Sequence, residues 1–463
     1  MRGWILCFLC AAHLQAAELR IGTGAVRITP PPGAPMAGYY YHRGAEGVHD
    51  DLWAKALVIE ADGQRAALVA CDLIGLPGAI VEEARRILEK DPGIPPAFAM
   101  FSATHAHTGP LLVQDRMTRA PEGEMLRLAT AYSRELPEKL AECVRLAAAR
   151  MQPARLSAGR GRQEDLAFNR RFLMKDGSVG WNPGKGNPNA VRPIGPTDPE
   201  VPVVLLESPD GKPLAGCVNF ALHLDTVGGT HYSADYPFTL SRLLQESLGD
   251  GFFTLFTIGC AGNLNHIDIR WARPQKGNTE AARIGTLLAA EVLRAWKKAE
   301  PLEAAVLKAA RSTVSLPLAE IRPEELAWAR QVTPKFGKPG AAPFLDLVRA
   351  FRITEIDDRR GRPVDAEVQA IALGPDIAWL GLPGEIFTEL GLAIKAASPF
   401  RFTLISELTN DSIGYVPNRK AYEEGAYEVV SSRLAPGAGE MLADAAVRLL
   451  VDLHSTAAPE RKP

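Results

Sequence analysis

The sequence lacks an excess of either charge: 52 lysine and arginine residues stand against 54 aspartate and glutamate residues, for a formal net charge of −2 over 463 positions. Proteins that bind nucleic acid neutralise phosphates with a surplus of lysine and arginine, and no such surplus exists here. The charge balance therefore argues against a nucleic-acid partner. With 46% hydrophobic and 23% charged residues, the composition is that of an ordinary globular protein.

Long hydrophobic runs are lacking beyond the N-terminus. Residues 1–17, MRGWILCFLCAAHLQAA, combine Arg2, a short apolar core and the pair Ala16 and Ala17. This pattern is typical of a secretory signal peptide, and its apolar core is too short to span a bilayer. No later run reaches about 18 apolar residues. We therefore predict an exported protein, periplasmic or secreted, without a transmembrane segment.

Cysteine is scarce, with six residues, and two of them fall in the predicted signal peptide. The other four are Cys71, Cys143, Cys217 and Cys260. An even number in an exported protein permits disulfides. Buried free thiols are equally compatible with a core of this size, so the sequence leaves both possibilities open.

Internal sequence repeats are absent, and strand-like runs alternate with helical ones. Apolar runs flank short turns at residues 61–64, 209–211 and 374–376, which predicts three β-hairpins. Helical periodicity covers residues 79–90, 124–151, 279–300 and 439–454, and a helix start is predicted at Asp235 and Pro237. Adjacent hairpins favour antiparallel or mixed sheets. We predict an α/β protein, mixed α and β, with mixed, largely antiparallel sheets, packing helices and one large catalytic-type domain over residues 18–460.

Two long connections, residues 181–199 and 333–343, are rich in glycine and proline. Loops of this length are typical of lids and binding loops. Simple surface insertions have the same composition, so both interpretations stand.

Histidine is sparse as well, with nine residues, yet two of them lie two positions apart in SATHAHTGP, residues 102–110. The preceding apolar run predicts a strand. If that strand continues through the motif, alternation puts His105 and His107 on one face, and both rings address one site.

Other polar residues also follow apolar strands. His223 ends NFALH, Glu385 follows the turn in LGLPGE, and Tyr415 lies in a loop flanked by glycine and proline. Loops at strand ends converge to form sites. A catalytic zinc ion takes histidine nitrogens and carboxylate oxygens and keeps a position for water, which His105, His223 and Glu385 would satisfy. None of these spacings is a motif by itself, so a core histidine or a capping glutamate remains an alternative.

Several segments, taken in order from about Gly22 to about Glu428, share a wider pattern: GTGAVRITPPPGAPMAGYYYHRGAEGVHDDLWAKALVIEADG, SATHAHTGP, NFALH with SADYP, LPGE and GYVPNRKAYEEGAYE. Together they resemble the N-terminal catalytic domain of the neutral/alkaline ceramidases. In that family the domain is a zinc-dependent amide hydrolase that splits ceramide into sphingosine and a fatty acid. The resemblance implies a ceramidase-like hydrolase of sphingolipid or other lipid metabolism.

Matched by motif position, the resemblance implies four protein ligands for one Zn²⁺ per chain: His105, His223, Glu385 and Tyr415. It also places His107 and Arg170, the latter in FNRR, along the substrate. His107 would move a proton to the leaving amine, because an imidazole titrates near neutrality. Arg170 would hold a developing oxyanion through a charge-assisted hydrogen bond, with a structural salt bridge as the alternative.

Two departures from the family pattern bear on the substrate. Ceramidases carry a serine in a Gly-Asp-Val-Ser-Pro-Asn stretch, whereas the comparable segment is IGCAGNLNHID, with Gly262 or Asn263 in place of the serine and Cys260 in place of the aspartate. Full-length ceramidases also continue into an immunoglobulin-like C-terminal domain, which we do not expect here. The missing serine bears on ceramide specificity more than on zinc chemistry.

We therefore predict an exported zinc hydrolase that cleaves an N-acyl (amide) linkage of a small-molecule or lipid substrate through metal-activated water. One alternative is a zinc esterase or amidase that acts on a more polar substrate. Another is a non-catalytic exported binding protein with the same fold. The sequence carries no signal for an oligomeric state.

Overall fold

The computed structural model describes residues 18–113, 120–304, 306–338 and 340–457. The predicted signal peptide, residues 1–17, lies outside these ranges. Among the helices of the described ranges, none combines the length and the apolar character that a bilayer crossing requires.

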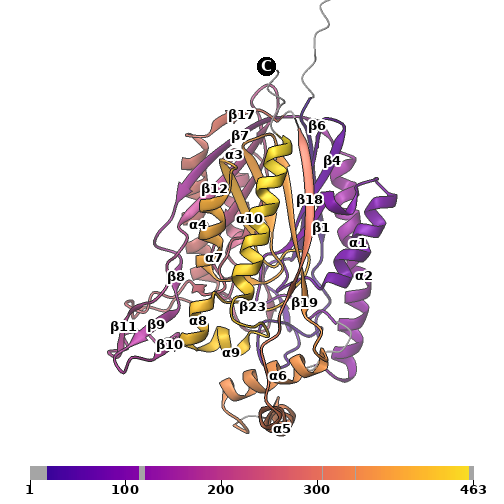
Figure 1. The fold of residues 1–463 in the computed structure, drawn as a ribbon. Coiled ribbons are helices and arrows are strands. Elements are labelled where there is room, and N and C mark those ends of the chain that lie inside the picture. The colour runs from indigo at the N-terminus through magenta and orange to yellow at the C-terminus, as the bar shows by residue number, and fades with distance from the viewer. Residues whose placement is uncertain (1–17, 114–119, 305, 339, 458–463) are drawn as a thin grey trace, which may run out of the picture.

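Three larger sheets form the centre of the described part of the chain (Figure 1). In the first, the strand order is β5-β4-β3-β1-β6. Two helices, α1 and α2, pack on its outer face, which is the face turned away from the other two sheets. Its elements are β1 (Arg20–Arg27), β3 (Trp53–Ala61), β4 (Gln64–Cys71), α1 (Gly78–Lys90), β5 (Ala99–Ala103), α2 (Gly123–Ala148) and β6 (Gln152–Pro153).

The second sheet has the order β15-β13-β12-β7-β17. Its elements are β7 (Arg155–Arg162), β12 (Glu200–Glu207), β13 (Pro213–Phe220), α3 (Tyr236–Leu248), β15 (Phe253–Ile258), α4 (Asn278–Trp296) and β17 (Glu300–Leu302). The third sheet has the order β18-β19-β20-β22. Its elements are β18 (Leu307–Leu316), β19 (Val364–Leu373), β20 (Ile377–Gly381), α7 (Thr388–Ala397), β22 (Phe402–Ser406) and α10 (Ala438–Ala457).

The three sheets share one topology although the sequence shows no repeat. In each, a hairpin is followed by a crossover helix and a parallel strand: β3-β4-α1-β5, β12-β13-α3-β15 and β19-β20-α7-β22. An antiparallel strand pairs with the outer side of each hairpin. Parallel neighbours require a crossover connection, and the intervening helix supplies it each time. The carboxyl ends of the last two strands of each unit are therefore the places from which site loops emerge.

A common core joins the three sheets. One buried cluster contains Leu57 and Leu68 of the first sheet, Val204 of the second, and Ile371 and Trp379 of the third. The outer face of each sheet buries a second cluster beneath its own helices. Each sheet is thus covered on both faces, which explains why strands such as β4 and β20 are nearly continuous apolar runs.

The predicted hairpins, the predicted helices and the predicted fold class are confirmed. The three hairpins turn at the positions expected, and α1, α2, α4 and α10 overlap the four periodic segments. Asp235 caps α3, since its carboxylate accepts a hydrogen bond from the Tyr236 amide, and Pro237 lies in the first turn. The sheets are mixed and helices pack on them, as the alternation of strand-like and helical runs and the turn residues predicted.

An insertion between β18 and β19 was not predicted as helical. It contains α5 (Pro323–Val332), a single 3₁₀ turn at Thr333–Lys335, and α6 (Phe344–Asp358), which share a small apolar cluster of their own. In Figure 1 these helices lie below the three sheets. The glycine- and proline-rich residues 333–343 are the link between α5 and α6.

Several short strands lie outside the three larger sheets. A three-stranded sheet, β10-β9-β11, consists of β9 (Arg171–Met174), β10 (Val179–Trp181) and β11 (Ala190–Pro193), and it includes part of the other glycine- and proline-rich connection. Two-residue strands form further pairs: β2 (Gly47–Val48) with β14 (His231–Tyr232), β8 (Phe168–Asn169) with β16 (Leu264–Asn265), and β21 (Glu385–Ile386) with β23 (Tyr415–Val416). A 3₁₀ turn at Pro96–Phe98 and the helices α8 (Arg419–Glu424) and α9 (Tyr427–Ser431) complete the described elements.

The cysteine question is resolved in favour of free thiols. Within the described ranges, Cys71, Cys143, Cys217 and Cys260 are all buried and unbridged. Burial raises the pKa of the Cys260 thiol well above its usual value, and the nearby Glu407 raises it further. A thiol held in its neutral form is a poor nucleophile, so Cys260 has the character of a core residue.

Candidate metal site

The site lies where loops from all three sheets meet. His105 follows β5 of the first sheet, His223 follows β13 of the second, and Glu385 follows β20 of the third. Backbone hydrogen bonds tie these loops together: the His107 amide donates to the Leu224 carbonyl at 3.1 Å, and the Leu408 amide donates to the Gly384 carbonyl at 3.1 Å. The carboxyl ends of the strands thus supply one shared site.

The two histidines of SATHAHTGP do not lie on a strand, which corrects the expectation from side-chain alternation. Strand β5 ends at Ala103, and His105 has a φ of +72°, a left-handed conformation that is uncommon outside glycine. The loop is held by a hydrogen bond of 2.9 Å from the His105 amide to the Leu73 carbonyl. The rings still converge, with centroids 4.7 Å apart, but a loop turn brings them together.

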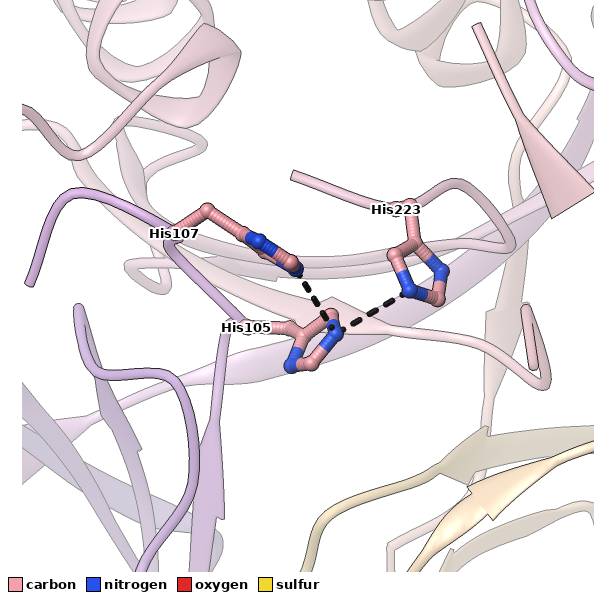
Figure 2. Close-up of side chains that lie close together, drawn as sticks. All are labelled: His105, His107 and His223. Atoms are coloured by element: carbon pink, nitrogen blue, oxygen red, sulfur yellow. Dashed lines mark hydrogen bonds between the residues drawn. The ribbon is translucent and has the colours of Figure 1, made fainter. Parts of the chain in front are cut away.

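Three imidazole nitrogens face one another at the centre of the site (Figure 2). The Nε2 atom of His105 lies 3.1 Å from Nε2 of His223 and 3.2 Å from Nε2 of His107. One ligand atom from each of the three residues falls within 4.8 Å of the others, so this cluster could hold a metal ion.

Two of the rings have their tautomer fixed by the backbone. Nδ1 of His105 lies 2.8 Å from the Ile74 carbonyl oxygen, and Nδ1 of His223 lies 3.0 Å from the Ala261 carbonyl oxygen. A carbonyl can only accept, so Nδ1 must carry the proton in both rings. Both Nε2 atoms then present lone pairs to each other, an arrangement that a cation between them stabilises and that is typical of metal-ligating histidine.

Glu385 supplies a carboxylate at the same point. Its Oε2 atom lies 3.4 Å from Nε2 of His105 and 3.3 Å from Nε2 of His223. This oxygen is buried and has no hydrogen-bond partner among the described residues. Burial raises the pKa of Glu385, but the two histidines outweigh burial and hold it well below its usual range. An ionised, unpartnered oxygen beside two nitrogen lone pairs fits the donor set of a zinc ion.

Tyr415 joins the site through strand pairing. It lies opposite Glu385 in the short parallel pair β21 and β23, and it is buried. Its hydroxyl accepts a hydrogen bond of 3.1 Å from Nη2 of Arg170. Burial raises the pKa of the Tyr415 hydroxyl well above its usual value, and Glu385 raises it further, whereas Arg170 opposes the rise.

Arg170 is anchored on several sides. Its Nε donates to Glu428 at 2.8 Å, and Nη2 donates both to the Gly262 carbonyl at 2.7 Å and to Tyr415. Burial lowers the pKa of Arg170, but Tyr415 and Glu428 outweigh it and raise the pKa, so the guanidinium is permanently charged. The predicted contact of Arg170 with substrate stays a prediction.

His107 differs from the other two histidines because no carbonyl fixes its tautomer. Its Nδ1 atom is buried without a hydrogen-bond partner in the described ranges and lies 3.8 Å from Oδ1 of Asp225. The Tyr39 hydroxyl donates to the same oxygen at 2.6 Å. Burial lowers the pKa of His107 to about 4, and Asp225 acts in the opposite direction. A neutral ring beside a carboxylate is suited to accept a proton.

The segment that departs from the ceramidase pattern is packed tightly. A Cβ atom at Gly262 would lie 2.5 Å from the Glu385 carbonyl oxygen, so a serine at this position would displace the backbone beside the site. Asn263 is fully buried, and its amide bonds to Glu389 at 2.8 Å and to the Thr388 amide at 2.9 Å. Neither residue presents a hydroxyl to the site.

Sequence reasoning missed Glu407, which holds the loops of the second and third sheets. Its Oε2 atom accepts hydrogen bonds from the Ala261 amide at 3.2 Å and the Ile386 amide at 2.7 Å. The carbonyl of Ala261 orients His223, and Ile386 adjoins Glu385. Burial raises the pKa of Glu407 well above its usual value, and Glu385 raises it further. Its place after the apolar strand β22 was the only signal in the sequence.

A cavity of about 290 Å³ opens onto the site. His105, His107, Glu385 and Tyr415 line it together with aromatic residues from three segments: Tyr39, Tyr40, Tyr41, Phe336, Phe351 and Tyr427. This volume lies at the lower end of the range for small-molecule sites. Both glycine- and proline-rich connections reach its surroundings, since Phe336 lines the cavity and Trp181 stacks on Tyr427 with centroids 4.4 Å apart.

No family model matches the sequence, and no curated protein matches it. Solved structures match the fold. The crystal structure of neutral ceramidase from Pseudomonas aeruginosa gives a TM-score of 0.73 at 21% identity and covers 96% of this chain and 76% of that chain. A structure of ceramidase complexed with C2 gives a TM-score of 0.72 at 20% identity, with coverage of 96% and 77%. The predicted resemblance to the neutral ceramidases is confirmed at the level of the fold.

Proposed function

We propose that the protein is an exported zinc-dependent hydrolase of N-acyl amide linkages. The observation that carries the proposal is the convergence of two histidines of fixed tautomer, His105 and His223, on the unpartnered carboxylate oxygen of Glu385. The structural likeness to neutral ceramidase supports amide hydrolysis as the reaction. The signal-like residues 1–17 support export.

His105, His223 and Glu385, with Tyr415 as a fourth ligand, are the residues that would hold the ion. Two nitrogens and a carboxylate oxygen are the ligand types of catalytic zinc sites. When bound, the ion polarises a carbonyl and activates a water nucleophile at neutral pH.

The chain's own residues would position and move protons around the scissile bond. His107 would accept a proton from the attacking water and deliver it to the leaving nitrogen, a role worth about 10²–10⁴-fold in rate. Asp225, 3.8 Å from Nδ1 of His107, would stabilise the imidazolium that forms in between. Arg170 would act through Tyr415, whose hydroxyl it holds at 3.1 Å.

An esterase or amidase acting on a more polar substrate remains the second candidate. It is favoured by the packing of Gly262 and Asn263, which offers no hydroxyl where ceramidases carry a serine. The same fact favours a non-catalytic binding protein. A carboxylate oxygen that is left without a hydrogen-bond partner opposes the binding protein, because burying such a group is costly unless a ligand or metal occupies the site.

The deciding experiment measures metal content and hydrolysis together. The purified protein should contain one zinc ion per chain and release the fluorophore from N-acyl substrates, and a chelator should abolish the release. A matched acyl ester tests the esterase. One zinc ion per chain with turnover of neither substrate would contradict the enzyme, and N-terminal sequencing that finds Met1 retained would contradict export.

A further inference from the structure

Arg352 lines the cavity that opens onto the candidate metal site. It lies on α6, in the helical insertion between β18 and β19, and it shares the cavity with His105, His107 and Glu385. Nothing in the proposed chemistry uses a second cation at this place.

The guanidinium of Arg352 is poorly paired. Its Nε atom is buried without a hydrogen-bond partner, and no ion pair joins it to another residue of the described ranges. The nearest carboxylate on its own helix, Glu355, is engaged by Arg433. One turn earlier, Arg349 is paired with Glu325 across the insertion. Arg352 as a whole is half-buried, but a buried guanidinium nitrogen without a hydrogen-bond partner is costly because it has lost its hydration.

The charges around the cavity leave Arg352 uncompensated. Apart from histidines, the charged residues that line it within the described ranges are Arg352, Arg433, Glu355 and Glu385. Glu385 faces the metal site and Glu355 faces Arg433. Burial lowers the pKa of Arg352, and the charge of Arg349 lowers it further, whereas Glu325 acts in the opposite direction. A divalent cation at the histidines would make the cavity still more positive.

The rest of the wall is apolar and aromatic. Phe336 and Phe351 stand edge to face with centroids 5.4 Å apart, and Tyr40 and Tyr427 line the same cavity. Such a wall suits an acyl chain, and the half-buried Arg352, which has no ion pair within the described ranges, suits one anionic group. A guanidinium binds a carboxylate through two parallel hydrogen bonds, which sets both position and specificity.

We propose that Arg352 is a specificity-determining residue that binds a carboxylate of the substrate, so that the enzyme acts on linear amides that carry one. This inference rests on the proposed amide hydrolysis. The carboxylate lies either on the amine half, as in an N-acyl amino acid, or at the far end of the acyl half. Both forms present the same group to Arg352.

Three probes separate these forms: N-octanoylglycine, the neutral N-octanoylethanolamine, and the monoethanolamide of octanedioic acid. The zinc-loaded protein should favour one of the two carboxylates over the neutral amide in kcat/KM by about 10- to 100-fold, the worth of a charge-assisted hydrogen bond. Arg352→Gln should remove that preference, mainly through KM, and Arg352→Lys should restore part of it. The carboxylate that is preferred shows whether Arg352 binds the amine half or the acyl half of the substrate.

Arg330→Gln is the matched control. Arg330 is an exposed guanidinium on α5 that pairs with Asp357 at 2.9 Å, and it does not line the cavity. Removing it takes the same charge from the same insertion, so the ratio between substrates should stay within about 2-fold of wild type, as for an exposed pair. A preference that survives Arg352→Gln, or a wild-type enzyme that favours the neutral amide, overturns the inference.

Failure of the proposed hydrolysis can be told apart from failure of this inference. If none of the three amides is cleaved, the proposed function fails, and calorimetric titration of each of the two carboxylates, N-octanoylglycine and the monoethanolamide of octanedioic acid, into the zinc-loaded protein still tests Arg352. Binding that weakens about 10-fold or more in Arg352→Gln and not in Arg330→Gln supports the assignment. Equal binding to all three proteins refutes it.

Discussion

The division of roles between the histidines can be tested by metal-dependent stability. The perturbations are His223→Ala, which removes a ligand of fixed tautomer, and His107→Ala, which removes a ring whose Nδ1 faces Asp225. We expect the first variant to lose zinc, because it leaves His105 as the only nitrogen ligand of the proposed set, and the second to keep it, because His107 is not one of the proposed ligands.

The size of the effect follows from linkage and from chain length. Zinc at about 1,000 times its dissociation constant stabilises the folded state by about 4 kcal/mol. The described chain runs from residue 18 to residue 457. At about 2.1 cal/mol/K per residue, roughly 440 residues give an unfolding entropy of about 0.9 kcal/mol/K. Zinc should therefore raise the wild-type melting temperature by about 4–5 °C.

The assay is differential scanning calorimetry with zinc and with chelator on each protein, alongside elemental analysis. Each variant is compared with itself, so destabilisation caused by the substitution cancels. His107→Ala should keep the full shift while its single-turnover rate falls by about 10²–10⁴-fold, and His223→Ala should show no shift. Loss of the shift in His107→Ala would show that His107 is a ligand and would refute the proposed division.

Three further outcomes are expected. Asp225→Asn should lower kcat by at least about 10-fold at unchanged zinc content, because a carboxylate 3.8 Å from Nδ1 favours the imidazolium; an unaltered pH–rate profile would speak against it. Gly262→Ser should weaken zinc binding by chelator competition, since its Cβ would lie 2.5 Å from the Glu385 carbonyl; full affinity would show that the backbone there can move. Burial lowers the pKa of His266 to about 4, below its unfolded value, so the stability that it contributes is present above about pH 6.5 and is lost as the pH falls toward 4. In urea titrations the wild type should lose about 2.5 kcal/mol more than His266→Gln between pH 7 and pH 4.5, and equal losses would contradict this account.

Short-range sequence patterns were enough to predict most of the strands and helices. The turn residues of the three hairpins, the periodicity of α1, α2, α4 and α10, and the cap at Asp235 depend on interactions within a few residues, so the chain order alone encodes them. The insertion that contains α5 and α6 escaped prediction because its apolar cluster is small and its linker is rich in glycine and proline.

The residues of the candidate site were predictable as types, but their roles needed the structure. His105, His223, Glu385 and Tyr415 were each marked by their place after an apolar strand. The proton on Nδ1 of His105 depends on the carbonyl of Ile74, which belongs to another loop of the first sheet. No property of the sequence near His105 specifies that contact.

The sequence by itself determined most of the strands and helices, since these follow from turn residues and short-range periodicity, whereas the set of candidate metal ligands came from the resemblance to the ceramidases. Tertiary structure decided that three sheets of one topology bring their carboxyl ends together, that His105 takes a left-handed turn, and that Nε of Arg352 has no hydrogen-bond partner in the described ranges. The physical reason is that tautomer, charge compensation and metal geometry depend on atoms contributed by segments more than a hundred residues apart, such as His105 and His223 at 3.1 Å.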